Sequence, residues 1–279
     1  MNHQLSSIPG PIGVFDSGYG GLTILSKIRE ALPAYDYIYL GDNARNPYGT
    51  RSFQIVYEFT LQAVTKLFEL GCHLVIIGCN TASAKALRSI QMNDLHLLDA
   101  NRRVLGVIRP TVECIGDLTV TRHIGLLATP GTVKSESYPL EIKKLYPEVV
   151  VSSQACPMWV PLVENGEADS DGADYFVQKY LDELLAKDDR IDTIILGCTH
   201  YPLLLPKIRQ YVPSHVNIIT QGELVAESLK DYMKRHPEVD AKCTQGGTCT
   251  YFTTESEEKF SESASIFLNE AVQVKHIDL

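Results

Sequence analysis

The sequence predicts an α/β protein made of two similar α/β domains with mostly parallel sheets. Three observations carry this prediction. Short apolar runs alternate along the chain with segments whose apolar residues recur at helical spacing. A Gly-Cys dipeptide follows an apolar run in each half of the chain, at Cys79 and at Cys198. The length of 279 residues suits two domains or one large domain.

The first half alternates strands and helices. Short apolar runs indicate strands at 12–15, 37–40, 74–77 and 104–108. Apolar residues at helical spacing indicate intervening helices at 22–32, 55–67 and 82–87. Pro33 stops the first helix, and Gly71 lies where a glycine commonly follows a helix. This order is typical of parallel strands joined by helices.

The second half repeats the plan. The expected strands are 124–128, 149–151, 193–196 and 216–219. A helical stripe is formed by Phe176, Tyr180 and Leu184, and a last helix is indicated at 224–233. We place the first domain at 1–104 plus 216–279 and the second at 105–215, so that the C-terminal segment returns to the first domain.

The two cysteine segments suggest an internal duplication. Residues 74–81 align with 193–200, and each cysteine is preceded by an earlier strand-end loop at a similar distance. Asp16 lies 63 residues before Cys79, and Thr129 lies 69 residues before Cys198. Because a strand followed by glycine and a loop is common, coincidence is the alternative.

Composition limits the function. The chain has 25 Lys and Arg against 34 Asp and Glu, a net charge of −9, which argues against nucleic-acid and anionic-membrane partners but permits a small anion. Seven cysteines, an odd number in a long chain, indicate free thiols in a reducing compartment. The apolar runs are too short for a membrane span, and the N-terminus shows no signal peptide. We therefore expect a cytoplasmic protein.

Chemistry-bearing residues cluster where strands end, the usual place for ligands in α/β sheets. The strand-end residues are Asp16-Ser17-Gly18, Cys79-Asn80-Thr81, 129–132 and Cys198-Thr199-His200. They include two thiols, one carboxylate, one imidazole and several small donors, but no lysine. The alternatives are structural: helix caps for the polar residues and small buried side chains for the cysteines.

Several other chemistries fit poorly. The segment Gly18-Tyr19-Gly20-Gly21 imitates a dinucleotide loop, but Thr23 occupies the place of the last glycine. The close cysteine pairs Cys72/Cys79 and Cys243/Cys249 lack zinc-site spacing, so no metal is expected. A thiol hydrolase with Cys198 as nucleophile and His200 as base stays open, although it leaves Cys79 without a task.

Two thiols facing each other across a substrate suit the inversion of a stereocentre. One base removes a proton from one face and a second acid returns a proton to the other face. Asp16 beside Cys79 and His200 beside Cys198 are candidates for controlling thiolate formation. Donors for the substrate carboxylate would be Asn80, Thr81, Thr132 and Thr199.

These residues carry a resemblance to the bacterial glutamate racemases, cofactor-independent enzymes that supply D-glutamate for peptidoglycan. The similar segments run from residue 15 to residue 203. They are Phe15-Asp16-Ser17-Gly18-Tyr19-Gly20-Gly21-Leu22, Gly41-Asp42-Asn43-Ala44-Arg45-Asn46-Pro47-Tyr48-Gly49, Gly78-Cys79-Asn80-Thr81-Ala82, Val160-Pro161-Leu162-Val163-Glu164 and Gly197-Cys198-Thr199-His200-Tyr201-Pro202-Leu203.

The resemblance implies an active site in the cleft between the two domains, with no cofactor and with glutamate as substrate. Cys79 and Cys198 would be the two acid/base residues, assisted by Asp16, Glu164 and His200. Implied substrate contacts are Asp16, Ser17, Tyr48, Gly49, Asn80, Thr81, Thr132, Thr199 and His200. The other cysteines, Cys72, Cys114, Cys156, Cys243 and Cys249, would be packing residues. A homodimer is the assembly we consider.

Alternatives and departures remain. A related aspartate or hydantoin racemase is the nearest rival, and a carboxylate-binding regulatory protein is a non-catalytic one. The chain departs from the family pattern at Asn43, where Thr is usual, at 109–111, where Glu-Pro-Gly is usual, and at 220–222, where Asp-Ser-Gly is usual. The last two lie near the predicted domain crossings, so we expect them to affect the hinge, the interface or regulation more than the chemistry.

Overall fold

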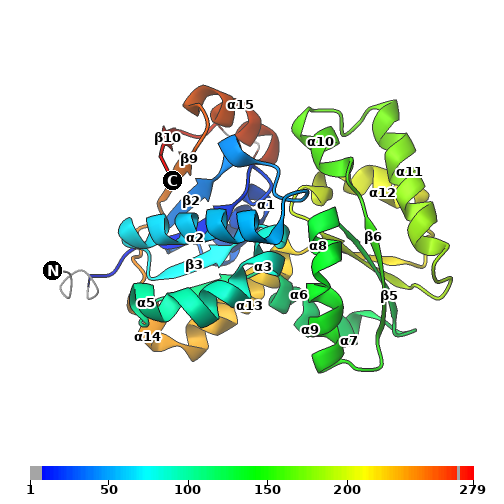
Figure 1. Cartoon of the computed structure of the whole chain (residues 1–279), viewed down its shortest axis with the longest axis horizontal. Coiled ribbons are helices and arrows are strands. Elements are labelled where there is room, and N and C mark those ends of the chain that lie inside the picture. The colour runs from blue at the N-terminus through cyan, green and yellow to red at the C-terminus, as the bar shows by residue number, and fades with distance from the viewer. Residues whose placement is uncertain (1–7, 269–270) are drawn as a thin grey trace.

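The computed structural model describes residues 8–268 and 271–279. In this part of the chain the strands form two sheets, one in each half of the molecule in Figure 1. The first sheet has the order β10-β9-β2-β1-β3-β4, and the second has the order β6-β5-β7-β8. All neighbouring strands are parallel. The predicted fold class is therefore confirmed.

The strands are short, as parallel strands buried on both faces usually are. The first sheet contains β1 (Ile12–Asp16), β2 (Tyr37–Gly41), β3 (Leu74–Ile77), β4 (Arg103–Gly106), β9 (Cys249–Thr253) and β10 (Val274–His276). The second sheet contains β5 (His123–Ala128), β6 (Val150–Ala155), β7 (Thr193–Gly197) and β8 (Asn217–Ile219).

Helices cover both sheets. The part of the chain up to and just after β4 contains α1 (Leu22–Ala31), α2 (Phe53–Glu69), α3 (Asn80–Lys85), α4 (Leu87–Ser89), α5 (Leu95–Asp99) and α6 (Ile108–Glu113). The second half contains α7 (Ile115–Leu118), α8 (Pro130–Ser135), α9 (Ser137–Leu145), α10 (Trp159–Glu164), α11 (Asp171–Leu185) and α12 (Leu205–Tyr211). After β8 the chain returns to the first sheet and forms α13 (Gly222–Arg235), α14 (Pro237–Asp240) and α15 (Glu257–Leu268).

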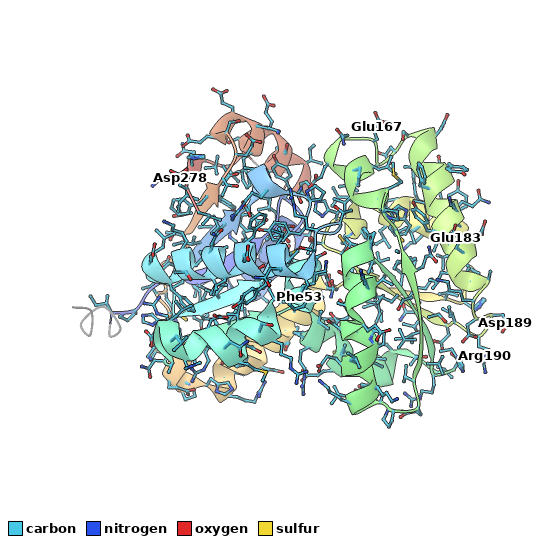
Figure 2. All side chains as sticks on the ribbon, viewed as in Figure 1. Phe53, Glu167, Glu183, Asp189, Arg190 and Asp278 are labelled. Atoms are coloured by element: carbon cyan, nitrogen blue, oxygen red, sulfur yellow. The ribbon has the colours of Figure 1, made fainter. Side chains whose placement is uncertain are left out.

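Each sheet has an apolar core on both of its faces. Successive residues of a strand point to opposite sides, so Val14 packs into one core of the first sheet and Phe15 into the other. Leu196 and Ile195 do the same in the second sheet. This two-sided burial explains the continuous apolar runs of the sequence. Charged side chains such as Glu183 and Asp189 point outward instead (Figure 2).

The chain crosses between the sheets after β4 and again after β8, and two expectations are corrected there. The run 104–108 is a strand only as far as Gly106, and Ile108 begins α6. The domain boundary before Val216 assigned 216–219 to the first domain, but β8 pairs with β7 of the second sheet. The second crossing therefore follows Ile219.

The regular structure continues beyond α13, which the sequence analysis took as the last helix. Strand β9 pairs with β2, and β10 pairs with β9, so the C-terminal segment extends the edge of the first sheet. Helix α15 lies over this edge (Figure 1). Among the described residues, no helix has both the length and the apolarity needed to cross a membrane.

Candidate active site

Both Gly-Cys loops lie at the carboxyl ends of their strands, β3 and β7, and they line one cavity of about 70 Å³. The predicted site residues in its wall are Ser17, Tyr48, Gly49, Cys79, Asn80, Thr81, Cys198, Thr199 and His200. Asp16, Thr132 and Glu164 are outside this wall but hydrogen-bond to residues within it. Cys156, predicted to be a packing residue, also contributes to the wall.

Cys79 is buried and caps α3. Its Sγ accepts a hydrogen bond from the Ala82 amide at 3.4 Å and lies 3.4 Å from Ser17 Oγ. Burial, followed by the nearby Asp16 carboxylate, raises the pKa of the Cys79 thiol to about 12. At neutral pH Cys79 is therefore a thiol that can donate a proton.

Asp16 ends β1 and is buried between the two cysteine loops. Its Oδ1 accepts a hydrogen bond from the Gly18 amide at 2.9 Å, and its Oδ2 accepts one from Thr199 Oγ1 at 3.4 Å. Burial raises the pKa of Asp16, although the charge of His200 and the backbone hydrogen bonds oppose this shift. A carboxyl group in this position can exchange a proton more readily than an exposed aspartate.

Cys198 has a different partner. Its Sγ lies 3.9 Å from His200 Nδ1, and His200 Nε2 lies 2.9 Å from Glu164 Oε1. Burial alone would lower the pKa of His200, but the hydrogen bonds with Cys198 and Glu164 raise it to about 10. His200 is therefore a cation at neutral pH, held against the Cys198 sulfur by Glu164.

The glycine-rich segment after β1 has a steric task rather than a nucleotide-binding one. A Cβ on Gly20 would collide with Thr199 Oγ1 and with the His200 ring. Thr23 Oγ1, which follows it, lies 3.1 Å from the Thr199 carbonyl oxygen. The absence of a side chain at Gly20 thus lets the first-sheet loop approach the Cys198 loop closely.

A cluster of hydroxyl groups lies beside the cysteines. Thr81 Oγ1 is 2.9 Å from Thr129 Oγ1 and 3.3 Å from Thr132 Oγ1. Thr129 also accepts a hydrogen bond from the Thr132 amide at 3.2 Å, which caps α8. Since Thr81 comes from the first sheet and the others from the second, the cluster can hold a carboxylate where the two halves meet.

The sequence profile of the Asp/Glu/Hydantoin racemase family matches residues 12–229. The chain belongs to this family. It is 39% identical to the glutamate racemase of Ruegeria sp. (strain TM1040) over 271 residues, which are 94% of this chain and 97% of that protein. A glutamate racemase isoform of Bacillus anthracis superposes with a TM-score of 0.88 at 34% identity, covering 97% of this chain and 98% of the other.

A second solved structure carries a ligand. The glutamate racemase of Francisella tularensis in complex with D-glutamate superposes with a TM-score of 0.85 at 31% identity. The match covers 97% of this chain and 98% of that chain. Both sheets of the present molecule are therefore arranged as in racemases of this family.

Two of the predicted substrate contacts use their side chains elsewhere. The Tyr48 hydroxyl donates to Asp42 Oδ2. Asn80 Nδ2 donates to Gln221 Oε1 at 2.6 Å, and Asn80 Oδ1 accepts from the Tyr138 hydroxyl at 2.6 Å. Both residues still line the cavity.

Two of the departures from the racemase family pattern meet in space. Gln221 Nε2 donates to Thr111 Oγ1 at 2.8 Å and to the Tyr138 hydroxyl at 2.6 Å. Thr111 lies just after the first crossing and Gln221 just after the second. Together with Asn80, these buried residues form a hydrogen-bonded hinge cluster, defined here as Asn80, Thr111, Tyr138 and Gln221. The third departure, Asn43, accepts a hydrogen bond from Thr253 Oγ1 at 3.1 Å.

Sequence reasoning missed Asn46, and it marked Gln221 only as part of a departure from the family pattern near a domain crossing. Asn46 Nδ2 donates to Glu164 Oε1 at 2.6 Å and so links the loop after β2 to α10. The residues that each contacts lie far away in the sequence, so no local pattern marks them. Asn46 does lie within a segment similar to the family, which was the only signal for it.

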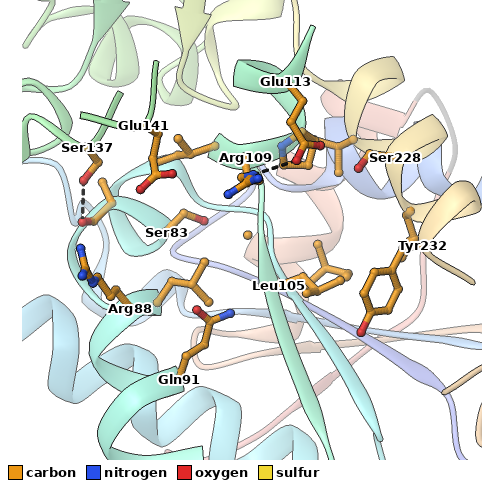
Figure 3. A pocket seen from close by; sticks show the side chains of 18 of the residues that line it. Ser83, Arg88, Gln91, Leu105, Arg109, Glu113, Ser137, Glu141, Ser228 and Tyr232 are labelled. Carbon is orange, nitrogen blue, oxygen red and sulfur yellow. Dashed lines mark hydrogen bonds and ion pairs between the residues drawn. The ribbon is translucent and has the colours of Figure 1, made fainter. Parts of the chain in front are cut away.

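The largest cavity described lies elsewhere. It has a volume of about 630 Å³ and is lined by residues of α3, α6, α9 and α13, among others. Its wall is mixed: Arg109 pairs with Glu113 at 2.7 Å, and Ser137 donates to the Ala84 carbonyl oxygen at 2.9 Å (Figure 3). Neither Cys79 nor Cys198 lines this cavity, so cavity size does not identify the candidate active site in this racemase-family protein.

Proposed function

We propose that this protein interconverts L- and D-glutamate without a cofactor, using Cys79 and Cys198 as the two acid/base residues. The observation that carries the proposal is that one small cavity contains both thiols, one from each sheet. The similarity to glutamate racemases over nearly the whole chain supports glutamate as the substrate. In a cell that builds peptidoglycan, the product D-glutamate would serve wall synthesis.

The reaction is a 1,1-proton transfer at Cα. The thiolate of one cysteine takes the Cα proton, the electron pair of the broken C–H bond delocalises into the adjacent carboxylate, and the thiol of the other cysteine protonates the opposite face. The first cysteine ends as a thiol and the second as a thiolate. The enzyme is then poised for the reverse direction.

The surroundings of the cysteines suggest the resting protonation state. The cationic His200 stabilises a negative charge on the Cys198 sulfur 3.9 Å away. Cys79, whose pKa is raised to about 12, would start as the thiol. When Cys79 must act as the base, we propose that Asp16 receives its proton, because burial raises the pKa of Asp16 as well.

Substrate orientation would use the small donors of both halves. Ser17, Thr81, Thr132 and Thr199 supply hydroxyl groups near the cysteines, and Gly49 and Asn80 supply backbone groups. Glu164 is proposed to act through His200 rather than on the substrate. These groups would hold the carboxylate whose partial charge grows as Cα loses its proton.

Deuterium exchange tests this function. Either enantiomer of glutamate, incubated with the protein in D2O, should give the opposite enantiomer with deuterium at Cα. The same assay with aspartate and with a hydantoin separates the substrate classes of the family. A requirement for added pyridoxal phosphate, or tight glutamate binding without exchange, would refute the proposal.

The hydrolase alternative makes a different prediction. The Cys198–His200 contact would also suit a nucleophile and its base, and such an enzyme would form an acyl-enzyme at Cys198. It would be indifferent to Cys79, which the racemase requires. A homodimer and a cytoplasmic location stay predictions, the first of which analytical ultracentrifugation can test.

A further inference from the structure

Lys85 is a buried cation outside the machinery described so far. It is the last residue of α3, whose first residue follows Cys79, and it is only 7% exposed. Its Nζ donates to the Arg51 carbonyl oxygen at 2.6 Å. Among residues 8–268 and 271–279, no carboxylate lies within ion-pair distance of this ammonium group.

A second buried lysine shows what is unusual about Lys85. Lys207 is 8% exposed, and its Nζ lies 2.6 Å from the Asp174 carboxylate. Buried charges in proteins are normally paired in this way, because an isolated ion loses its hydration without compensation. Burial, with repulsion from Lys134, lowers the pKa of Lys85. The nearby Cys79 acts on this pKa in the opposite direction, but no carboxylate among the described residues provides Lys85 with a counter-charge.

Lys85 Nζ packs closely against Gly131, at the contact between the loop after β2 and α8. A Cβ placed on Gly131 would lie 2.8 Å from Lys85 Nζ and 2.7 Å from the Gly49 carbonyl oxygen. The Gly131 amide donates to that same oxygen at 2.7 Å, which joins the loop after β2 to α8. Gly49 and its neighbour Thr50 line the cysteine cavity, as do Thr129 and Pro130 next to Gly131. Lys85 thus lies directly behind the wall where the two halves touch.

The charge balance of the cavity points the same way. Asp16 and Glu164 place two carboxyl groups near the cysteines, against one cation at His200. A dicarboxylic amino acid adds two negative charges and one positive charge, in a protein whose net charge is −9. A nearby ammonium in a partly desolvated site offsets this excess more strongly than an exposed one would.

We propose that Lys85 selects for a dicarboxylic substrate, by holding the loop of Gly49 to Arg51 and by balancing the charge of the side-chain carboxylate from behind the cavity wall. The inference rests on the proposed racemase function, and it deepens it by assigning the charge selectivity of the site. Lys85 is a positioning residue, since it contacts the loop rather than the reacting atoms.

The test compares Lys85→Met, which keeps the length of the side chain, with Lys85→Arg, which keeps the charge. Calorimetry measures the Kd of glutamate and of glutamine, whose side chain is neutral. We expect Lys85→Met to weaken glutamate binding about tenfold and glutamine binding little. Lys85→Arg should keep most of the preference for glutamate. In turnover, Lys85→Met should raise the KM for glutamate and change kcat less than threefold.

Lys207→Met is the matched control, because it removes a buried lysine of similar exposure that pairs with Asp174 and does not line the cavity. It should leave the glutamate-to-glutamine Kd ratio unchanged. An equal loss of affinity for both ligands in Lys85→Met would overturn the proposal. If that variant fails to fold, the salt dependence of the wild-type Kd decides: glutamate binding should weaken with salt more than glutamine binding, and equal weakening counts against Lys85.

These outcomes are separate from the fate of the racemase function itself. A wild-type protein that binds glutamate without Cα exchange would refute racemisation while leaving the role of Lys85 measurable by binding. A wild-type protein that racemises glutamate, with an unchanged Kd ratio in Lys85→Met, would refute the role of Lys85 alone.

Discussion

The two cysteines occupy matching positions in the two sheets, but their surroundings differ. Each follows a parallel strand and a glycine, at the carboxyl edge of its sheet. Cys79 has a hydroxyl partner, Ser17, and the carboxylate of Asp16 nearby, whereas Cys198 has the cationic His200 backed by Glu164. The two cysteine loops thus have similar places in their sheets but different ionisable groups beside the thiol.

This difference shows how two similar α/β halves can serve a reaction that takes place on both faces of one carbon atom. One cavity contains both sulfur atoms, and in the proposed reaction the side chains around them would decide which cysteine begins with the proton. A pair with identical surroundings would have no preferred resting state. The asymmetry can be tested by changing one side at a time.

The largest effect is expected from the cysteines themselves. Cys79→Ser and Cys198→Ser should each reduce racemisation by about 10²–10⁴-fold, since a hydroxyl group is a far weaker acid and base than a thiol. Each variant should still exchange Cα hydrogen of one enantiomer only, and the enantiomer should differ between them. Deuterium incorporation without inversion, followed by NMR, measures this.

The asymmetry makes the two residual activities unequal. Cys79→Ser keeps Cys198 beside His200, so its one-sided exchange should be the faster. Cys243→Ser is the control, because Cys243 is a buried thiol that hydrogen-bonds to the Val239 carbonyl oxygen and is absent from the cavity wall. Equal residual exchange in the two cysteine variants would contradict the comparison, as would full activity in either.

A smaller effect is expected from Glu164→Gln, which weakens the asymmetry without removing a cysteine. Loss of the carboxylate removes one of the interactions that raise the pKa of His200 to about 10. The alkaline limb of the rate profile should move to lower pH, and activity at pH 8 should fall about tenfold. A pH–rate profile with both enantiomers measures this, and an unshifted limb would exclude the role of Glu164.

Stability should follow the same group. Because the pKa of His200 is raised on folding from 6.5 to about 10, its cation stabilises the folded state fully below about pH 6.5, and this contribution is lost as pH rises through about 10. As pH rises between these limits, the free energy of unfolding of the wild type should therefore fall relative to that of Glu164→Gln. Chemical unfolding at several pH values measures the difference, and a gap that widens with pH would contradict the assigned sign.

The local features of the fold and site could be predicted from the sequence. Strands buried on both faces are apolar runs, and strand-end residues such as Cys79 and Cys198 follow them directly, so position in the chain reveals position at the sheet edge. Glu164 was found only through resemblance. It lies on α10, and its link to His200 depends on how the chain returns to the sheet.

Other features could not be predicted because their causes are not local. Strand β9 carries two threonines and β10 is three residues long, so neither shows the apolar signal of the central strands. Lys85 ends α3 and lies beyond the strand-end residues, where the predicted site residues cluster. The partners of Gln221 come from segments more than 80 residues away.

The hinge cluster should give the smallest effect on chemistry. Gln221→Leu leaves the Asn80 amide and the Thr111 hydroxyl without their buried partner, which should cost about 2 kcal/mol of unfolding free energy. The cysteines stay in place, so kcat should fall less than threefold. Gln54→Leu, on the exposed face of α2, should change stability by no more than about 0.5 kcal/mol.

A double-mutant cycle then separates the cluster from simple loss of packing. Thr111→Val should cost less in the Gln221→Leu background than alone, because the hydrogen bond between the two side chains is already gone. Additive costs would mean that the two departures are neighbours without being coupled. Coupled costs with a nearly unchanged kcat would mean that the asymmetry of the reaction depends on the surroundings of the cysteines. The two chain crossings would then serve to hold the two sheets in their relative positions.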